Sequence, residues 1–186
     1  MLTPRENLLE TINFGNPEYV PLSYESIRTV GLPLLPLLEQ PRQNGPDPYG
    51  IRWVITPAGA MHDTTVPPLL DDIENWRDVV KIPDISHIDF KAAAEAELKD
   101  IDRNQQALAF CSTCGCYERL AAYMGFENAL VAMAEDPDET RAFMEAITDH
   151  KIEIANKVID AYGIDIYYNF DDIATANNLF ISPATY

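Results

Sequence analysis

Ala107-Leu-Ala-Phe-Cys111 and Ile164-Asp-Ile-Tyr-Tyr168 are the two stretches that decide the fold. Each is a short apolar run, which is typical of a strand buried in a parallel sheet. Between them, Asp136-Pro-Asp-Glu139 predicts the start of a long helix, because it supplies an N-cap, a proline at the first helical position and acids at the positive end of the dipole. This helix is predicted to run to Tyr162 and to end at Gly163. Strand, helix and strand with short connections predict a βαβ unit.

The chain before this unit is rich in proline: 12 of the 14 prolines precede residue 90. Proline lacks an amide hydrogen and clashes with a helix interior, so this half is predicted to consist of short elements joined by turns. Thr3, Pro4 and Glu6 together predict a capped helix start. The other predicted elements are strands at 19–24 and 51–56, a hairpin near His62, and helices at 4–14, near 73–76, at 87–103 and at 117–134.

Charge and composition restrict the class of protein. The chain has 186 residues, 47% of them hydrophobic, and a net charge of −17. The hydrophobic content predicts a folded chain, and the excess of acids argues against nucleic acid and anionic membrane surfaces as partners. No apolar run approaches the roughly 18 residues that cross a bilayer, and no signal-peptide pattern opens the chain. We therefore expect a cytoplasmic protein whose acidic surface either maintains solubility or steers a basic partner.

The three cysteines, Cys111, Cys114 and Cys116, fall within six residues. An odd number in a tight cluster makes no disulfide framework and indicates a reducing compartment. Thiolates at this spacing are candidates for binding one metal ion, but no fourth ligand is evident, and stable sites normally use four. The alternative is a small loop that happens to contain cysteine.

Several segments, taken in order and spacing, resemble the uroporphyrinogen decarboxylase (URO-D) superfamily, which also contains corrinoid-dependent methyltransferases. They are Thr3-Pro-Arg-Glu6, Asn16-Pro-Glu-Tyr-Val-Pro21, Asp47-Pro-Tyr-Gly-Ile-Arg-Trp53, Asp71-Asp-Ile-Glu-Asn-Trp76, Gly125-Phe-Glu-Asn-Ala-Leu130 with Asp136-Pro137, and Asp171-Asp172 leading to Ile181-Ser-Pro183. The resemblance spans essentially all 186 residues and covers the N-terminal half of a family member. It implies a (β/α)8 barrel with its site at the carboxyl ends of the strands.

We therefore predict an α/β fold: an incomplete (β/α)8 TIM barrel of about three parallel strands, at 19–24, 107–111 and 164–168. A proline-rich N-terminal region with short helices and a hairpin precedes it. Residues 1–186 would form one domain, with 1–105 as the N-terminal extension and first strand and 106–186 as the βαβ part. Ser182-Pro183 begins another helix signal just before Tyr186, so we expect the front part of a larger fold. Its open sheet edges predict a homo-oligomer or association with the missing C-terminal half.

Candidate site residues lie at the predicted strand ends and turns. Asp171 and Asp172 directly follow a strand, and paired carboxylates suit acid–base catalysis; the alternative is that a loop acid caps a neighbouring helix. The candidates for substrate binding are Tyr24, Asp47, Tyr49, Arg119 and Tyr168. Each also has a structural interpretation: turn formation for Asp47 and Tyr49, a helix salt bridge for Arg119, and core packing for Tyr168.

The resemblance leaves three functions open. Decarboxylase members grip substrate carboxylates with an Arg-rich segment after the first strand, whereas Pro21–Arg28 here offers only Arg28. A rim with Glu25, Asp47, Asp171 and Asp172 is a poor host for a porphyrinogen with eight carboxylates. The methyltransferase branch therefore fits better, and it implies zinc, a corrinoid partner protein and a small-molecule substrate.

The first alternative is a cofactor-free uroporphyrinogen decarboxylase of tetrapyrrole synthesis. Its anion pocket would have to be built by Arg5, Arg28, Arg42, Arg52 and Arg119. The second alternative is a truncated, non-catalytic chain that associates with another chain.

Overall fold

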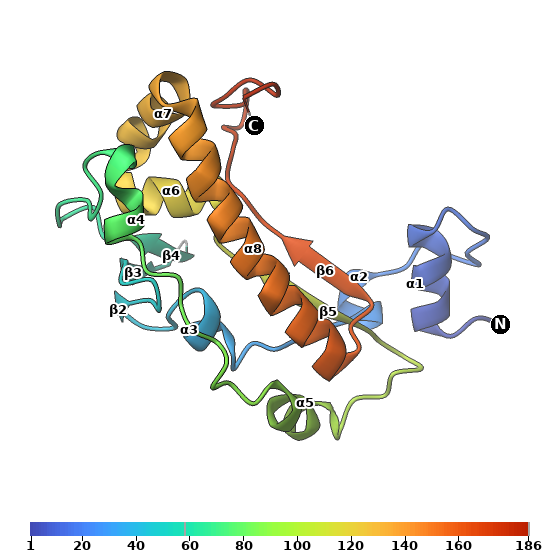
Figure 1. The fold of residues 1–186 in the computed structure, drawn as a ribbon. Helices are drawn as coiled ribbons and strands as arrows, with labels where there is room; N and C mark the ends of the chain where they lie inside the picture. The colour runs from blue at the N-terminus through green and yellow to red at the C-terminus, as the bar shows by residue number, and fades with distance from the viewer. Residues whose placement is uncertain (58, 186) are drawn as a thin grey trace. The chain divides into compact units, whose positions relative to one another are not determined.

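The computed structural model describes residues 1–57 and 59–185, and it shows an α/β fold (Figure 1). A parallel sheet has the strand order β1–β5–β6, with β1 at Ile27–Val30, β5 at Ala107–Ser112 and β6 at Ile166–Asn169. β1 pairs with β5 in a parallel register that sets Ile27 opposite Ala107 and Val30 opposite Phe110. A separate antiparallel sheet has the order β2–β3–β4, from Gly45–Pro46, Arg52–Thr56 and Gly59–His62.

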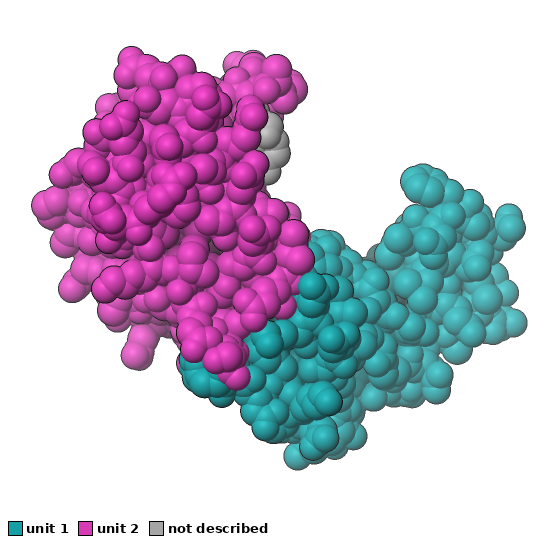
Figure 2. Space-filling model, viewed as in Figure 1, with its two compact units in different colours: residues 1–34, 87–111, 155–168 teal, residues 35–86, 112–154, 169–186 magenta. Residues whose placement is uncertain are grey.

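The chain divides into two compact units (Figure 2). The first comprises residues 1–34, 87–111 and 155–168, and the second comprises 35–86, 112–154 and 169–186. Helices α1 (Pro4–Ile12), α2 (Ser23–Ser26) and α5 (Phe90–Leu98) belong to the first unit, and α3 (Leu35–Leu38), η1 (Ile73–Asn75), α4 (Trp76–Val79), α6 (Cys116–Met124) and α7 (Phe126–Glu135) belong to the second. The long helix α8 (Pro137–Tyr162) contributes residues to both units.

The first unit is built around the buried strand β5. Phe110 is fully buried, and its ring stacks on Tyr167 with the centroids 5.9 Å apart. Gly31 has φ +76°, and a Cβ there would lie 2.6 Å from the Phe110 ring, so only glycine fits this position. Asp165 accepts a hydrogen bond from the Leu108 amide at 2.9 Å and is ion-paired with Arg5. Partial burial opposes ionisation of Asp165, but these donors hold its pKa below the ordinary value.

The second unit has a core of aromatic and aliphatic side chains from α4, α6, α7 and α8. Phe143 lies at its centre, with the rings of Trp76 and Tyr123 edge-on at centroid distances of 5.9 and 6.1 Å. The helix predicted at 117–134 is divided here into α6 and α7. The division falls at Gly125, whose φ of +83° ends the first helix, and the chain then turns into the second.

The largest error in the sequence-based elements concerns the first strand. Residues 19–24 form no strand; the strand that pairs with β5 is Ile27–Val30, and a single helical turn precedes it. The side chain of Asn7 explains the difference, because it accepts a hydrogen bond from the Glu18 amide at 2.7 Å and donates one to the Tyr19 carbonyl at 2.8 Å. These backbone groups are therefore bound to α1 and are not available for a sheet ladder.

The predicted α/β class with a three-stranded parallel sheet is confirmed. So are the strands near 51–56, 107–111 and 164–168 and the helix that begins at Pro137. In the described residues the parallel sheet ends at β1 and β6 and does not close into a barrel. Within residues 1–57 and 59–185, none of the helices has both the length and the apolar character that a bilayer crossing requires.

Candidate functional site at the carboxyl end of β5

The connection from β5 to α6 passes through Thr113, Cys114 and Gly115. Cys114 adopts φ +57°, a left-handed conformation uncommon for a residue with a side chain. The residue is 3% exposed, and burial raises the pKa of its thiol to about 12. Cys116 begins α6, with its Sγ 3.4 Å from Thr148 Oγ1, and burial also raises its pKa. Both thiols are therefore protonated at neutral pH.

Asp171 caps the first turn of α6. Its two carboxylate oxygens accept hydrogen bonds from the amides of Tyr117 and Glu118, each at 2.9 Å. Gly115 allows this approach, since a Cβ at that position would lie 2.1 Å from the Asp171 Cγ. The contact agrees with the helix-capping interpretation of Asp171, and the neighbouring Asp172 is exposed. Asp171 thus positions the helix, and Asp172 is the carboxylate that solvent or a ligand reaches.

Glu118 adds a third carboxyl group to this helix start. Its side chain accepts a hydrogen bond from the Gly115 amide at 3.1 Å, which is one half of a capping box, and Asp171 takes the place of the missing Gly115 side chain as acceptor for the Glu118 amide. Burial is the main cause that raises the pKa of Glu118, and the charges of Asp172 and Asp171 act in the same direction. The start of α6 therefore carries a carboxyl group that protonates more readily than an exposed glutamate.

Arg119 joins two other predicted site residues in the interior of the second unit. Its guanidinium is ion-paired with Asp47, donates to the Glu39 carbonyl at 3.1 Å, and lies over the Tyr49 ring at 3.9 Å. Asp47 also accepts hydrogen bonds from the amides of Tyr49 and Ile51, each at 2.9 Å. Because the Arg119 side chain is only 1% exposed, this group holds the turn before β3 against α6.

A second buried ion pair was not identified from the sequence. Lys151 Nζ lies 2.7 Å from a Glu39 carboxylate oxygen, 2.6 Å from Ser112 Oγ and 3.1 Å from the Thr113 carbonyl. The other Glu39 oxygen accepts from the Thr113 amide at 2.7 Å. One signal was present: Lys151 lies four residues after Ile147, on the stripe that α8 buries. The pair fixes the end of β5 and the loop that follows it.

His150 directly precedes Lys151 in α8 and is 4% exposed. Its ring meets Tyr49 edge-on, with the centroids 5.8 Å apart. Burial lowers the pKa of His150, so the ring is neutral at pH 7. The neutral ring therefore packs against Tyr49 much as an apolar side chain would.

The other predicted binding residues belong to the first unit. Tyr24 is 74% exposed, on the helical turn α2, and Tyr168 is 38% exposed, on β6. Cys111 also belongs to that unit and is half-buried in β5. In the described ranges, 1–57 and 59–185, no group of three or more His, Cys, Asp or Glu side chains is arranged to hold a metal ion.

The fold and the site define an α/β protein in which β5 ends in a loop of hydroxyl and thiol side chains, braced by two buried ion pairs. Comparison with known proteins found no match to this chain among family models, curated proteins or solved structures.

Proposed function

We propose that this chain corresponds to the N-terminal half of a URO-D-like (β/α)8 barrel enzyme, closer to the corrinoid-dependent methyltransferases than to the decarboxylases. The strand order supports the proposal, because β1, β5 and β6 are neighbours in the order in which the chain reaches them. Successive strands of a (β/α)8 barrel are neighbours in the same way. Polar side chains at the carboxyl end of β5 also lie where such barrels carry their chemistry.

The state of Arg119 is the observation that favours methyl transfer over decarboxylation. A substrate with many carboxylates requires free guanidinium groups, since an unpaired carboxylate is costly to desolvate. Arg119 is buried and committed to Asp47 and to the Glu39 carbonyl. The side chains around the loop that follows β5 are instead hydroxyls, thiols and carboxyls.

In the proposed reaction a methyl group passes from a corrinoid partner protein to the thiol of a small-molecule substrate. The substrate sulfur forms the new bond to the methyl carbon, and its proton passes to the Asp172 carboxylate. The corrinoid of the partner protein would supply the methyl group and retain the electron pair of the bond that breaks. Asp171 holds the start of α6 and so fixes the position of Asp172. Asp172 is the exposed residue of this pair, and its exposure supports its choice as the proposed base.

Zinc is the metal that the resemblance implies for this branch, where it activates the thiol as a Lewis acid. The described residues do not fit it: Cys114 is buried as a neutral thiol, and the Cys116 thiol is in hydrogen-bond contact with Thr148. We therefore assign no zinc ligand to Cys111, Cys114 or Cys116 and derive no step through the metal.

The test is an assay of methylcobalamin with 2-mercaptoethanol in the presence of a protein that joins this chain to the C-terminal half of the proposed barrel, followed by the absorbance change on demethylation. We expect turnover above the rate without protein, and a loss of about 100-fold in Asp172→Asn, as for removal of a general base. Asp71→Asn changes another exposed acid and should have no effect. Demethylation no faster than in buffer, or turnover of uroporphyrinogen instead, would refute the proposal.

The second candidate is a chain that functions by association with another chain. The sheet edges favour it, because in the described residues β1 and β6 each lack a strand on their outer side, and unpaired parallel edges are templates for pairing. Light scattering after size-exclusion chromatography should then give a mass at least twice the 20.9 kDa of the chain. A monomer at every concentration would contradict this candidate.

A further inference from the structure

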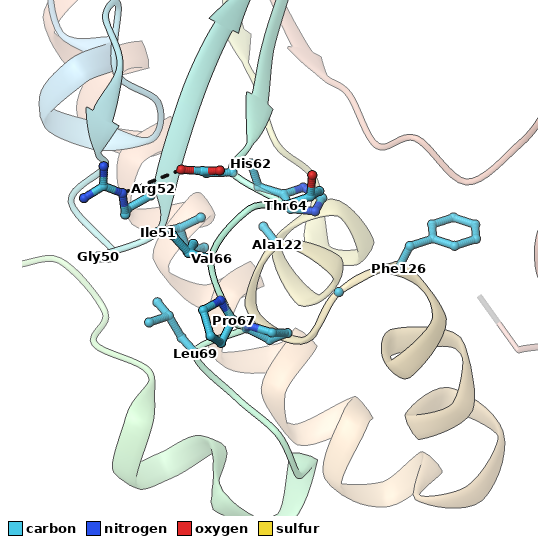
Figure 3. A pocket seen from close by; sticks show the side chains of 13 residues that line it. Gly50, Ile51, Arg52, His62, Thr64, Val66, Pro67, Leu69, Ala122 and Phe126 are labelled. Carbon is cyan, nitrogen blue, oxygen red and sulfur yellow. Dashed lines mark ion pairs between the residues drawn. The ribbon is translucent and has the colours of Figure 1, made fainter.

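A pocket of about 420 Å³ lies in the second unit, and its lining does not include Thr113, Cys114 or Gly115 of the loop that follows β5 (Figure 3). Three segments form it: the start of β3, the loop after β4, and the junction of α6 with α7. Its volume lies in the range of pockets that hold small organic molecules.

The walls of the pocket are held in place by local structure. Pro67 and Pro68 restrict the backbone of the loop, and the Leu70 amide ties its end to the Tyr123 carbonyl at 3.1 Å. Gly125 has φ +83° and no side chain, which keeps open the space facing Pro68. The pocket is therefore formed before any ligand arrives, and binding would not have to order the loop.

Most of the lining is apolar, and the polar groups lie along one edge. In Figure 3, Val66, Pro67 and Ala122 occupy the middle of the view, with Arg52 and His62 along one side. A ligand for this pocket must therefore have an apolar body with polar atoms at one end only.

The polar edge of the pocket holds one ion pair, between Arg52 and Asp63, and the cation is its more exposed partner. Arg52 is 63% exposed, and its Nε lies 3.8 Å from the nearer carboxylate oxygen of Asp63. Asp63 accepts hydrogen bonds from Thr65 through Oδ1, at 3.0 Å from the amide and 2.6 Å from the hydroxyl, and its Oδ2 is the oxygen beside Arg52. The contact of Oδ2 with Nε is longer than a hydrogen bond, and the Arg52 side chain is far more exposed than that of Asp63, so a ligand can reach the guanidinium. Burial lowers the pKa of His62, so its ring adds a neutral hydrogen-bonding group and no second charge. The guanidinium of Arg52 can then pair with an anionic group of a ligand.

We infer that this pocket is a binding site for a small organic acid, a compact aromatic or aliphatic body with one carboxylate that pairs with Arg52. The apolar body contacts Val66, Pro67 and Ala122, and the carboxylate lies at the edge beside His62. The site is distinct from the one proposed for methyl transfer, and its occupation does not depend on that reaction.

The experiment is calorimetric titration of the whole chain with 2-naphthoate and, separately, with the neutral 2-naphthalenemethanol. We expect saturable binding of the acid, and a Kd for it that rises about fivefold in Arg52→Gln, as expected when one near-surface charge pair is lost. The neutral alcohol should bind more weakly, and its Kd should not change in Arg52→Gln. Arg42→Gln removes another exposed arginine, outside the pocket, and is the matched control.

A negative or a positive charge introduced at Val66 tests the position of the site. The substitution leaves the core undisturbed, because Val66 is 39% exposed. Val66→Asp should weaken binding of 2-naphthoate, and Val66→Lys should strengthen it, each by about fivefold. Circular dichroism would establish that both variants are folded. Absence of binding, equal Kd values for the two Val66 variants, or equal affinity for the acid and the alcohol would overturn the inference.

Discussion

Removal of the Arg119 guanidinium should measure how much the buried ion pair with Asp47 contributes to the free energy of unfolding. In Arg119→Met the hydrophobic stem is retained, but the Asp47 carboxylate, which is fully buried, loses its counterion. Loss of one partner from a buried ion pair costs roughly 3–5 kcal/mol. Asp47 would keep three donors, the amides of Tyr49 and Ile51 and the Trp53 indole, each at 2.9 Å. We therefore expect the lower end, about 3 kcal/mol, or a fall in Tm of about 6–12 °C.

The assay is urea denaturation followed by tryptophan fluorescence. Both tryptophans, Trp53 and Trp76, lie in the second unit, so the transition reports the unit that contains the pair. The double variant Asp47→Asn with Arg119→Met should lose less than the sum of the two single variants, because no unpaired buried charge remains. A loss below 1 kcal/mol in Arg119→Met, or strictly additive losses, would refute the reasoning.

Three further predictions follow from the same unit. Gly115→Ala should displace the Asp171 carboxylate from α6 and lower the free energy of unfolding, measured in urea, by about 1–2 kcal/mol. Asp171→Asn keeps a hydrogen-bond acceptor and should lower this free energy by less. An equal loss in both variants would contradict the prediction. Burial sets the pKa of His150 in the folded state below its unfolded value of 6.5, so the unfolded state binds the proton more readily and stability falls as pH drops through about 6.5. Denaturation at pH 7.5 and 5.5 should show this loss, His150→Gln should lack it, and the same pH dependence in the variant would argue against the assignment. Iodoacetamide at pH 8 should label Cys116 before Cys114, which is 3% exposed and has a thiol pKa of about 12, and mass spectrometry of peptides would expose the reverse order.

Local signals account for the parts of the fold that could be predicted. Thr3 and Glu6 form the expected capping box, and Pro137 begins the expected long helix. The apolar run Ala107–Ser112 is a buried strand. In each case the residues that determine the element lie within the element or beside it. The local sequence is therefore enough to predict that element.

The misplaced and missing features depend on contacts between distant residues. The backbone near Glu18 is bound by Asn7, so a β-like composition at 19–24 does not make a strand. The partner of Lys151 is Glu39, which is 112 positions away, and no local pattern shows that pairing. The structure brings together three of the predicted site residues, Asp47, Tyr49 and Arg119. They form a buried cluster that stabilises the fold and is not open to a substrate.

The cap on α6 has a consequence for synthesis on the ribosome. The Asp171 carboxylate that binds the Tyr117 amide lies 54 residues further along the chain. Translation adds roughly 5–20 residues per second, so Asp171 is synthesised about 3–11 seconds after the first turn of α6. During that interval the amides of that turn are open to water or to a chaperone, and the helix start is completed only when the segment after β6 has been made.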